Sequence, residues 1–146
     1  MQPGRTHPNL IMVIDDSTIV RKILEVCLVR AGYDVVSFSN GVEAIRWLEK
    51  KGRFVPALVF LDIGLPIVDG CSLACYFSSL PIYRQMAIVM LTARNGLLSR
   101  IMARISGARA YITKPFTTHD ILQTTRTCLR QAGHRDAPGQ VLAVRR

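Results

Sequence analysis

Short apolar runs alternate with longer amphipathic segments over most of the chain. Five of these runs have the length and composition of buried strands, and they fall at residues 10–14, 34–38, 57–62, 87–92 and 110–113. They lack a regular alternation of apolar and polar residues, which indicates strands buried on both faces. Such strands, separated by helices, predict an α/β fold with a doubly wound, parallel, five-stranded sheet.

The segments between the strands carry helix start signals. Asn40 and Glu43 have the spacing of an N-cap residue and the third residue of a helix, and Thr117 and Asp120 form a similar pair. Ser17 can cap the first helix. The expected helices span residues 17–32, 40–50, 72–79, 97–106 (the weakest pattern) and 117–131.

At 146 residues, the chain is long enough for one domain with its own core. We expect this domain at residues 9–131, between an N-terminal extension at 1–8 and an aperiodic C-terminal tail at 132–146. No apolar run approaches the ~18 residues that span a bilayer. The first residues also lack the apolar centre of a signal peptide, so we expect a cytoplasmic protein.

The net charge of +9 is distributed unevenly along the chain. No acidic residue lies between Asp69 and Asp120, whereas this stretch contains Arg84, Arg94, Arg100, Arg104, Arg109 and Lys114. It is expected to carry a positive field that attracts an acidic partner or, less specifically, nucleic acid. A solubilising surface is an equally good explanation of the same charges.

Polar side chains follow four of the predicted strands at their carboxyl ends. Asp15 and Asp16 follow the first strand, and Asp62 ends the third. Thr92 ends the fourth strand, and Lys114 comes directly after the fifth. Because the carboxyl ends of parallel strands meet at one edge of an open sheet, these five side chains are expected to converge there.

Three carboxylates in one pocket raise each other's pKa unless a cation compensates their charge. Lys114 supplies one positive charge, and Mg²⁺ suits a site with few carboxylates, several waters and a phosphoryl ligand. The predicted chemistry is therefore attack by a carboxylate on phosphorus, with the metal and Lys114 neutralising the phosphoryl oxygens.

Other chemistries lack their motifs. The sequence has no glycine-rich nucleotide loop, no Ser–His–Asp arrangement and no zinc-ligand spacing. The four cysteines form no CxxC pair and lie in apolar surroundings, so we expect reduced core residues. They are Cys27, Cys71, Cys75 and Cys128.

Four segments together resemble the receiver domains of two-component response regulators. They are VIDDS (13–17), LVFLDIGLPIVDG (58–70), VMLTA (89–93) and AYITKPF (110–116), in the family's order and spacing. The resemblance covers about residues 9–131 and implies a flavodoxin-like (βα)5 fold with strand order 2-1-3-4-5.

The resemblance also implies a phosphorylation site. Asp62 would be the phospho-acceptor. Asp16 would bind Mg²⁺ directly and Asp15 directly or through water, with Asp62 and the backbone carbonyl of Gly64 as further ligands. Pro66 and Gly70 are expected to shape the loop that follows Asp62.

The remaining implied roles concern the phosphoryl group and the response to it. Lys114 would pair with the phosphoryl group, and Thr92 would move its hydroxyl onto a phosphoryl oxygen in the room left by Ala93. Tyr111 matches the aromatic residue that turns inward as Thr92 shifts. This movement would change the face formed by the fourth helix, fifth strand and fifth helix.

The resemblance predicts a signalling module rather than an enzyme, although the module would assist its own phosphotransfer and dephosphorylation. It resembles the stand-alone receivers of chemotaxis and twitching motility. We expect a sensor histidine kinase or phosphotransfer protein as phosphoryl donor, a downstream protein with an acidic surface, and no direct binding to DNA or membranes. Two alternatives remain: a scaffold that binds nucleic acid or another partner without phosphorylation and, less favoured, a phosphatase.

Overall fold

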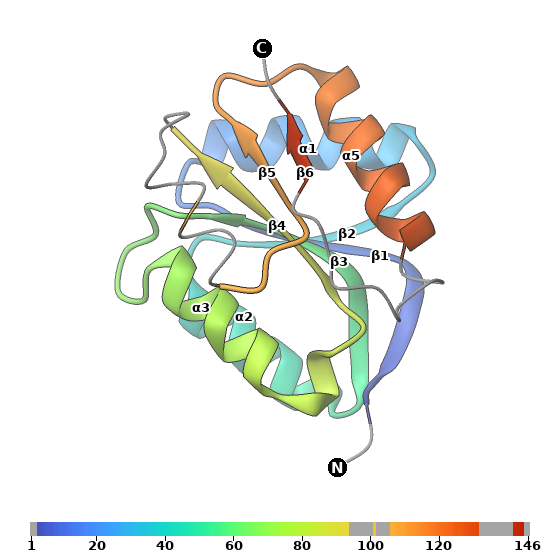
Figure 1. Cartoon of the computed structure of the whole chain (residues 1–146), viewed down its shortest axis with the longest axis vertical. Helices are drawn as coiled ribbons and strands as arrows, with labels where there is room; N and C mark the ends of the chain where they lie inside the picture. The colour runs from blue at the N-terminus through green and yellow to red at the C-terminus, as the bar shows by residue number, and fades with distance from the viewer. Residues whose placement is uncertain (1–2, 94–100, 102–105, 132–141, 145–146) are drawn as a thin grey trace.

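The computed structural model describes residues 3–93, 101, 106–131 and 142–144, and its centre is a sheet of six parallel strands (Figure 1). The strand order is β2-β1-β3-β4-β5-β6. This confirms the predicted fold class and the predicted order of the first five strands. The strands are β1 (Arg5–Ile14), β2 (Asp34–Phe38), β3 (Phe54–Asp62), β4 (Ala87–Thr92), β5 (Ala110–Thr113) and β6 (Leu142–Val144).

Helices α1 and α5 cover one face of the sheet, and α2 and α3 cover the other (Figure 1). Apart from two of its residues, the helix expected at 97–106 lies outside the described residues. The described helices are α1 (Thr18–Arg30), α2 (Gly41–Lys51), α3 (Gly70–Ser79), the short 3-10 helix η1 (Pro81–Tyr83) and α5 (Thr118–Gln131).

The predicted helix caps are present as hydrogen bonds. The Asn40 side chain accepts from the Glu43 amide at 2.9 Å. Thr117 and Asp120 bond reciprocally, each side chain accepting from the other residue's backbone amide. Helix α3 begins two residues earlier than predicted because Asp69 serves as its N-cap.

Two boundaries expected from the sequence need correction. Residues 5–8, expected to lie in an extension, belong to β1, where Arg5 and Thr6 pair with the start of β3. The amide of Gly4 donates to the carbonyl of Ile82 and fixes the entry to this strand. Residues Leu142–Val144, expected to lie in a tail, form β6 and pair with β5.

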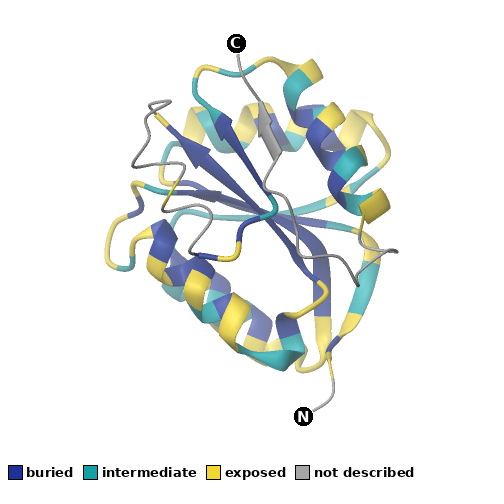
Figure 2. Cartoon of the chain, in the orientation of Figure 1, coloured by how far each residue is buried: buried dark blue, intermediate teal, exposed yellow. Residues whose placement is uncertain are grey.

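The core has two layers, one on each side of the sheet (Figure 2). Met12 and Ile14 pack towards α2 and α3, whereas Ile11 and Val13 pack towards α1 and α5. All four side chains are fully buried. Burial on both faces explains why the strand sequences do not alternate, and each such side chain contributes about 1.5–3 kcal/mol.

The four cysteines are free thiols. Three are buried, as expected, whereas Cys75 is exposed on α3. Burial raises the pKa of the Cys128 thiol to about 11. Among the helices of the described chain, none has both the length and the apolar character needed to cross a bilayer.

Candidate functional site

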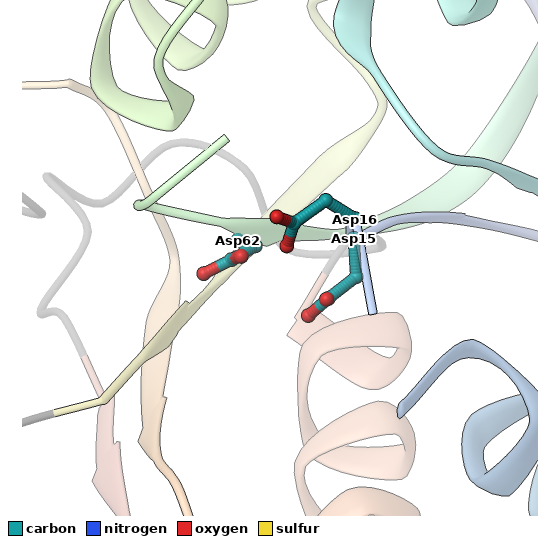
Figure 3. Close-up of side chains that lie close together, drawn as sticks. All are labelled: Asp15, Asp16 and Asp62. Carbon is teal, nitrogen blue, oxygen red and sulfur yellow. The ribbon is translucent and has the colours of Figure 1, made fainter. Parts of the chain in front are cut away.

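The acidic residues singled out in the sequence come together at the carboxyl ends of β1 and β3 (Figure 3). Asp15 and Asp16 directly follow β1, and Asp62 is the last residue of β3. One carboxylate oxygen from each residue lies within 4.8 Å of the others. This spacing allows the three carboxylates to share one cation. We call the site formed by Asp15, Asp16 and Asp62 the acidic pocket.

Lys114 brings a positive charge into the acidic pocket from β5. Its Nζ lies 2.7 Å from Oδ2 of Asp15 and 3.6 Å from Oδ1 of Asp62. The Lys114 amide donates to the carbonyl of Thr92 at 2.6 Å. This bond holds the start of the loop that follows β5 against the end of β4. The peptide bond between Lys114 and Pro115 is cis. The ammonium group therefore lies between two carboxylates that are far apart in sequence.

Asp15 is fully buried, and both of its carboxylate oxygens have partners. Oδ1 accepts a hydrogen bond from the Ser17 amide at 2.9 Å, and Oδ2 accepts from Lys114. The Arg21 guanidinium donates to the Asp15 backbone carbonyl at 2.6 Å. The Ser17 and Arg21 contacts, which the sequence did not indicate, hold the β1–α1 turn and with it the position of Asp15.

Asp62 is 8% exposed, and its charge is less well compensated. Burial, and then repulsion from Asp15, raise the pKa of the Asp62 carboxyl above its usual value. Lys114 and the Gly64 amide, which donates to Oδ1 at 3.2 Å, lower it by less. An additional cation would stabilise the ionised form of Asp62. A hard divalent cation fits this donor set because each of the three residues offers a carboxylate oxygen. Asp16 is exposed to solvent, so such an ion could keep bound waters as well.

The other predicted site residues are Thr92 and Ala93, at the end of β4, and Tyr111, in β5. Thr92 ends β4, is 4% exposed, and lies opposite Thr113 in the β4–β5 ladder. Ala93 follows it and is exposed. Tyr111 is 4% exposed and packs in the core layer on the α2 and α3 side, so its ring is already buried in this structure.

The loop after Asp62 is held by a close approach of two backbone segments. Gly70 begins α3, and its amide donates to the carbonyl of Ile63 at 3.0 Å. A Cβ on Gly70 would lie 2.1 Å from the carbonyl oxygen of Asp62. Only glycine fits here without displacing the backbone. The start of α3 can therefore pack directly against the backbone of Asp62 and hold this residue in place.

A parallel α/β sheet with an acidic pocket and a lysine at the strand ends defines a class of phosphoryl-accepting signalling domains. The family model for the response regulator receiver domain matches residues 11–126. The chain belongs to this family, which confirms the resemblance seen in the sequence. Receiver domains are signalling domains that take phosphoryl groups from histidine kinases.

Curated relatives differ in how much of their length the chain covers. Protein PilG of Pseudomonas aeruginosa is 32% identical over 112 residues, which are 77% of this chain and 81% of PilG. A probable transcriptional regulator of Pyropia yezoensis, ycf27, is 36% identical over 122 residues, 84% of this chain but 48% of that protein. The chain thus spans about half the length of several of the regulators it matches.

Solved structures share the fold over most of the chain. A CheY-like receiver protein from Methanospirillum hungatei has a TM-score of 0.77 and 25% identity, covering 86% of this chain and 97% of that one. Chemotaxis response regulator CheY4 of Vibrio cholerae has a TM-score of 0.74 and 25% identity, covering 82% and 97%. The receiver domain of a sensor histidine kinase from Pseudomonas aeruginosa, with 23% identity, a TM-score of 0.73 and coverage of 84% and 98%, has a magnesium ion in its active-site cleft.

Proposed function

We propose that this receiver domain is switched by phosphorylation of Asp62 in an Mg²⁺-dependent reaction. The observation that carries the proposal is the acidic pocket itself, in which Lys114 lies within 3.6 Å of Asp62 and contacts Asp15. A carboxylate with a raised pKa and an adjacent ammonium group suits a nucleophile that must accept a highly charged group.

In the proposed reaction, an oxygen of Asp62 forms a bond to phosphorus while the bond from phosphorus to the donor's histidine nitrogen breaks. The electron pair of that bond leaves on the histidine. Mg²⁺, when bound, would neutralise charge on the transferred phosphoryl group. Asp15, Asp16, Asp62 and the Gly64 carbonyl would hold the ion, with Asp15 contributing directly or through water. Lys114 would pair with the phosphoryl oxygens, and the same groups would assist the later hydrolysis of the acyl phosphate.

The proposed response to phosphorylation runs from Thr92 to Tyr111. Phosphorylation adds roughly two negative charges at the end of β3. The Thr92 hydroxyl would move onto a phosphoryl oxygen, and the small side chain of Ala93 leaves space for this contact. Because the Tyr111 ring is already buried, the switch would act by holding or releasing it. The change would reach the face formed by the fourth helix, β5 and α5. Most of the residues expected to form the fourth helix lie outside the described part of the chain.

The proposed partners follow from this scheme and from charge. A sensor histidine kinase or phosphotransfer protein would supply the phosphoryl group. A downstream protein with an acidic surface would bind the responsive face, because residues 70–119 contain basic but no acidic side chains. Of the basic residues at 94, 100, 104 and 109, only Arg109 lies among the described residues.

Incubation with acetyl phosphate and Mg²⁺ is expected to add one phosphoryl group to the protein, at Asp62. Intact-mass spectrometry would detect the adduct, and hydroxylamine should remove it because an acyl phosphate is labile to this nucleophile. Asp62→Asn should give no adduct, whereas Asp69→Asn, which changes an exposed carboxylate outside the pocket, should label like the wild type. Equal labelling of wild type and Asp62→Asn would refute the assignment.

Millimolar Mg²⁺ is expected to raise the melting temperature of the wild type and to have less effect on Asp16→Ala. At an ion concentration ten times the dissociation constant, binding to the folded state alone adds about 1.4 kcal/mol. Asp16→Ala removes a proposed ligand but also relieves repulsion, so without metal it should be as stable as the wild type or more stable. Asp34→Ala, an exposed residue at the start of β2, is the control. A wild-type melt that does not respond to Mg²⁺ would contradict the metal assignment.

A further inference from the structure

The edge of the sheet next to β5 is covered by the chain's own β6. On one side, β5 pairs with β4 at four register positions, and on the other it pairs with Leu142–Val144 at three. Strand β6 lies beside β5 (Figure 1). The pairing is parallel and places Ala143 opposite Tyr111. Without β6, β5 would be an edge strand with unpaired backbone amides and carbonyls, which is a template for another strand.

Strand β6 is an addition to the part of the chain that the family shares. The receiver-domain match ends at residue 126, whereas β6 begins at Leu142. The strand has three residues, so it forms few backbone hydrogen bonds and can be displaced by a longer extended segment. The pairing of Leu142–Val144 with β5 shows that this edge accepts a short segment, and the sequence of that segment, Leu-Ala-Val, is apolar.

We propose that the β5 edge is a docking surface for an extended, mainly apolar segment of a partner protein, and that β6 is a built-in competitor for it. The partner segment would run parallel to β5, as β6 does, and main-chain hydrogen bonds would provide its affinity. In one respect the proposal rests on the proposed function: the partner would be the protein whose binding changes when Asp62 is phosphorylated. Strand capture at β5 stands without it.

The first test measures amide hydrogen exchange in β5 of the full chain. Val144→Pro removes the backbone amide that the parallel register directs at the carbonyl of Tyr111, whereas Val144→Ile keeps this amide and favours a strand. Peptides covering Ala110–Thr113 should be protected in the wild type and in Val144→Ile. In Val144→Pro they should lose part of that protection, while peptides from β3 keep theirs. An unprotected β5 edge in the wild type would overturn the proposal, whatever the variants do.

The second test measures binding of a fluorescent peptide with the sequence of residues 140–146. It should bind Val144→Pro about tenfold or more tightly than wild type or Val144→Ile, because the competing strand blocks the edge in most wild-type molecules. The same peptide carrying Val144→Pro should bind more weakly than the unmodified peptide to each protein. Failure of the unmodified peptide to bind the Val144→Pro protein would show that the edge does not accept a strand.

Light scattering distinguishes a second copy of the chain as the occupant. A monomeric wild type supports the intramolecular pairing, whereas a dimer lost in Val144→Pro would show that β6 is exchanged between two copies and overturn the built-in competitor. None of these experiments uses a phosphoryl donor or Mg²⁺. Their failure is therefore distinguishable from failure of the proposed phosphorylation.

Discussion

Replacing Lys114 by methionine is expected to destabilise the metal-free protein by about 3 kcal/mol. Asp15 is fully buried and would lose the ammonium group that now lies 2.7 Å from its Oδ2. Methionine has a similar volume, so the loss would come from an uncompensated buried charge and not from a cavity. The Lys114 side chain is 22% exposed, and water can partly replace it, which puts the expected value at the lower end of the range for buried pairs.

Urea unfolding in the presence of EDTA would measure this loss. Adding Mg²⁺ should restore part of it, since a divalent cation in the acidic pocket would also compensate the charge of Asp15. Lys22→Met, which changes an exposed lysine on α1, is the matched control and should alter stability by less than about 0.5 kcal/mol. Equal losses in the two variants would mean that the contact between Lys114 and Asp15 contributes little.

The substitution Gly70→Ala is expected to cost about 3 kcal/mol and to disturb the site without changing any charged group. The new methyl carbon would lie only 2.1 Å from the carbonyl oxygen of Asp62, which is closer than van der Waals contact allows. The obstacle is backbone, which cannot rotate away as a flexible side chain can. Either the start of α3 or the end of β3 must move, and Asp62 would move with it.

Thermal melts and acetyl phosphate labelling would test this expectation together. The control is Gly64→Ala, where a Cβ would meet only Oδ1 of Asp62, at 3.9 Å, and where the backbone carbonyl is retained. Gly70→Ala should melt at a clearly lower temperature than this control, and it should label more slowly than the wild type. Identical melting temperatures would show that the loop adjusts to the methyl group at little cost.

Much of the fold follows from local patterns in the sequence. Continuous apolar runs such as residues 57–62 and 87–92 correctly predicted buried parallel strands, because both faces of the sheet are covered. Pairs with capping spacing, such as Asn40 and Glu43, predicted the helix starts because their hydrogen bonds are local. The rule that the carboxyl ends of parallel strands share one edge of the sheet was enough to predict that Asp62 lies near Asp15 and Asp16.

Features that depend on tertiary contacts could not be predicted in this way. The first residues of β1 are polar and contain Pro8, and they join the sheet only because β3 lies beside them. Strand β6 is too short to have a detectable period. The sequence also predicted that Lys114 would meet the carboxylates, but it could not show that Asp15, and not Asp62, is the closer partner.

The direction of β6 has a practical consequence for reporters attached to this protein. Because β6 runs parallel to β5, the chain leaves it at the same edge of the sheet as Lys114 and the acidic pocket. The N-terminus enters at the opposite end (Figure 1). A fluorescent protein or affinity tag joined to the chain downstream of Val144 would therefore be tethered on the side of the acidic pocket and would pull on the strand that covers β5. A tag placed before Arg5 would leave the acidic pocket and the β5 edge unobstructed.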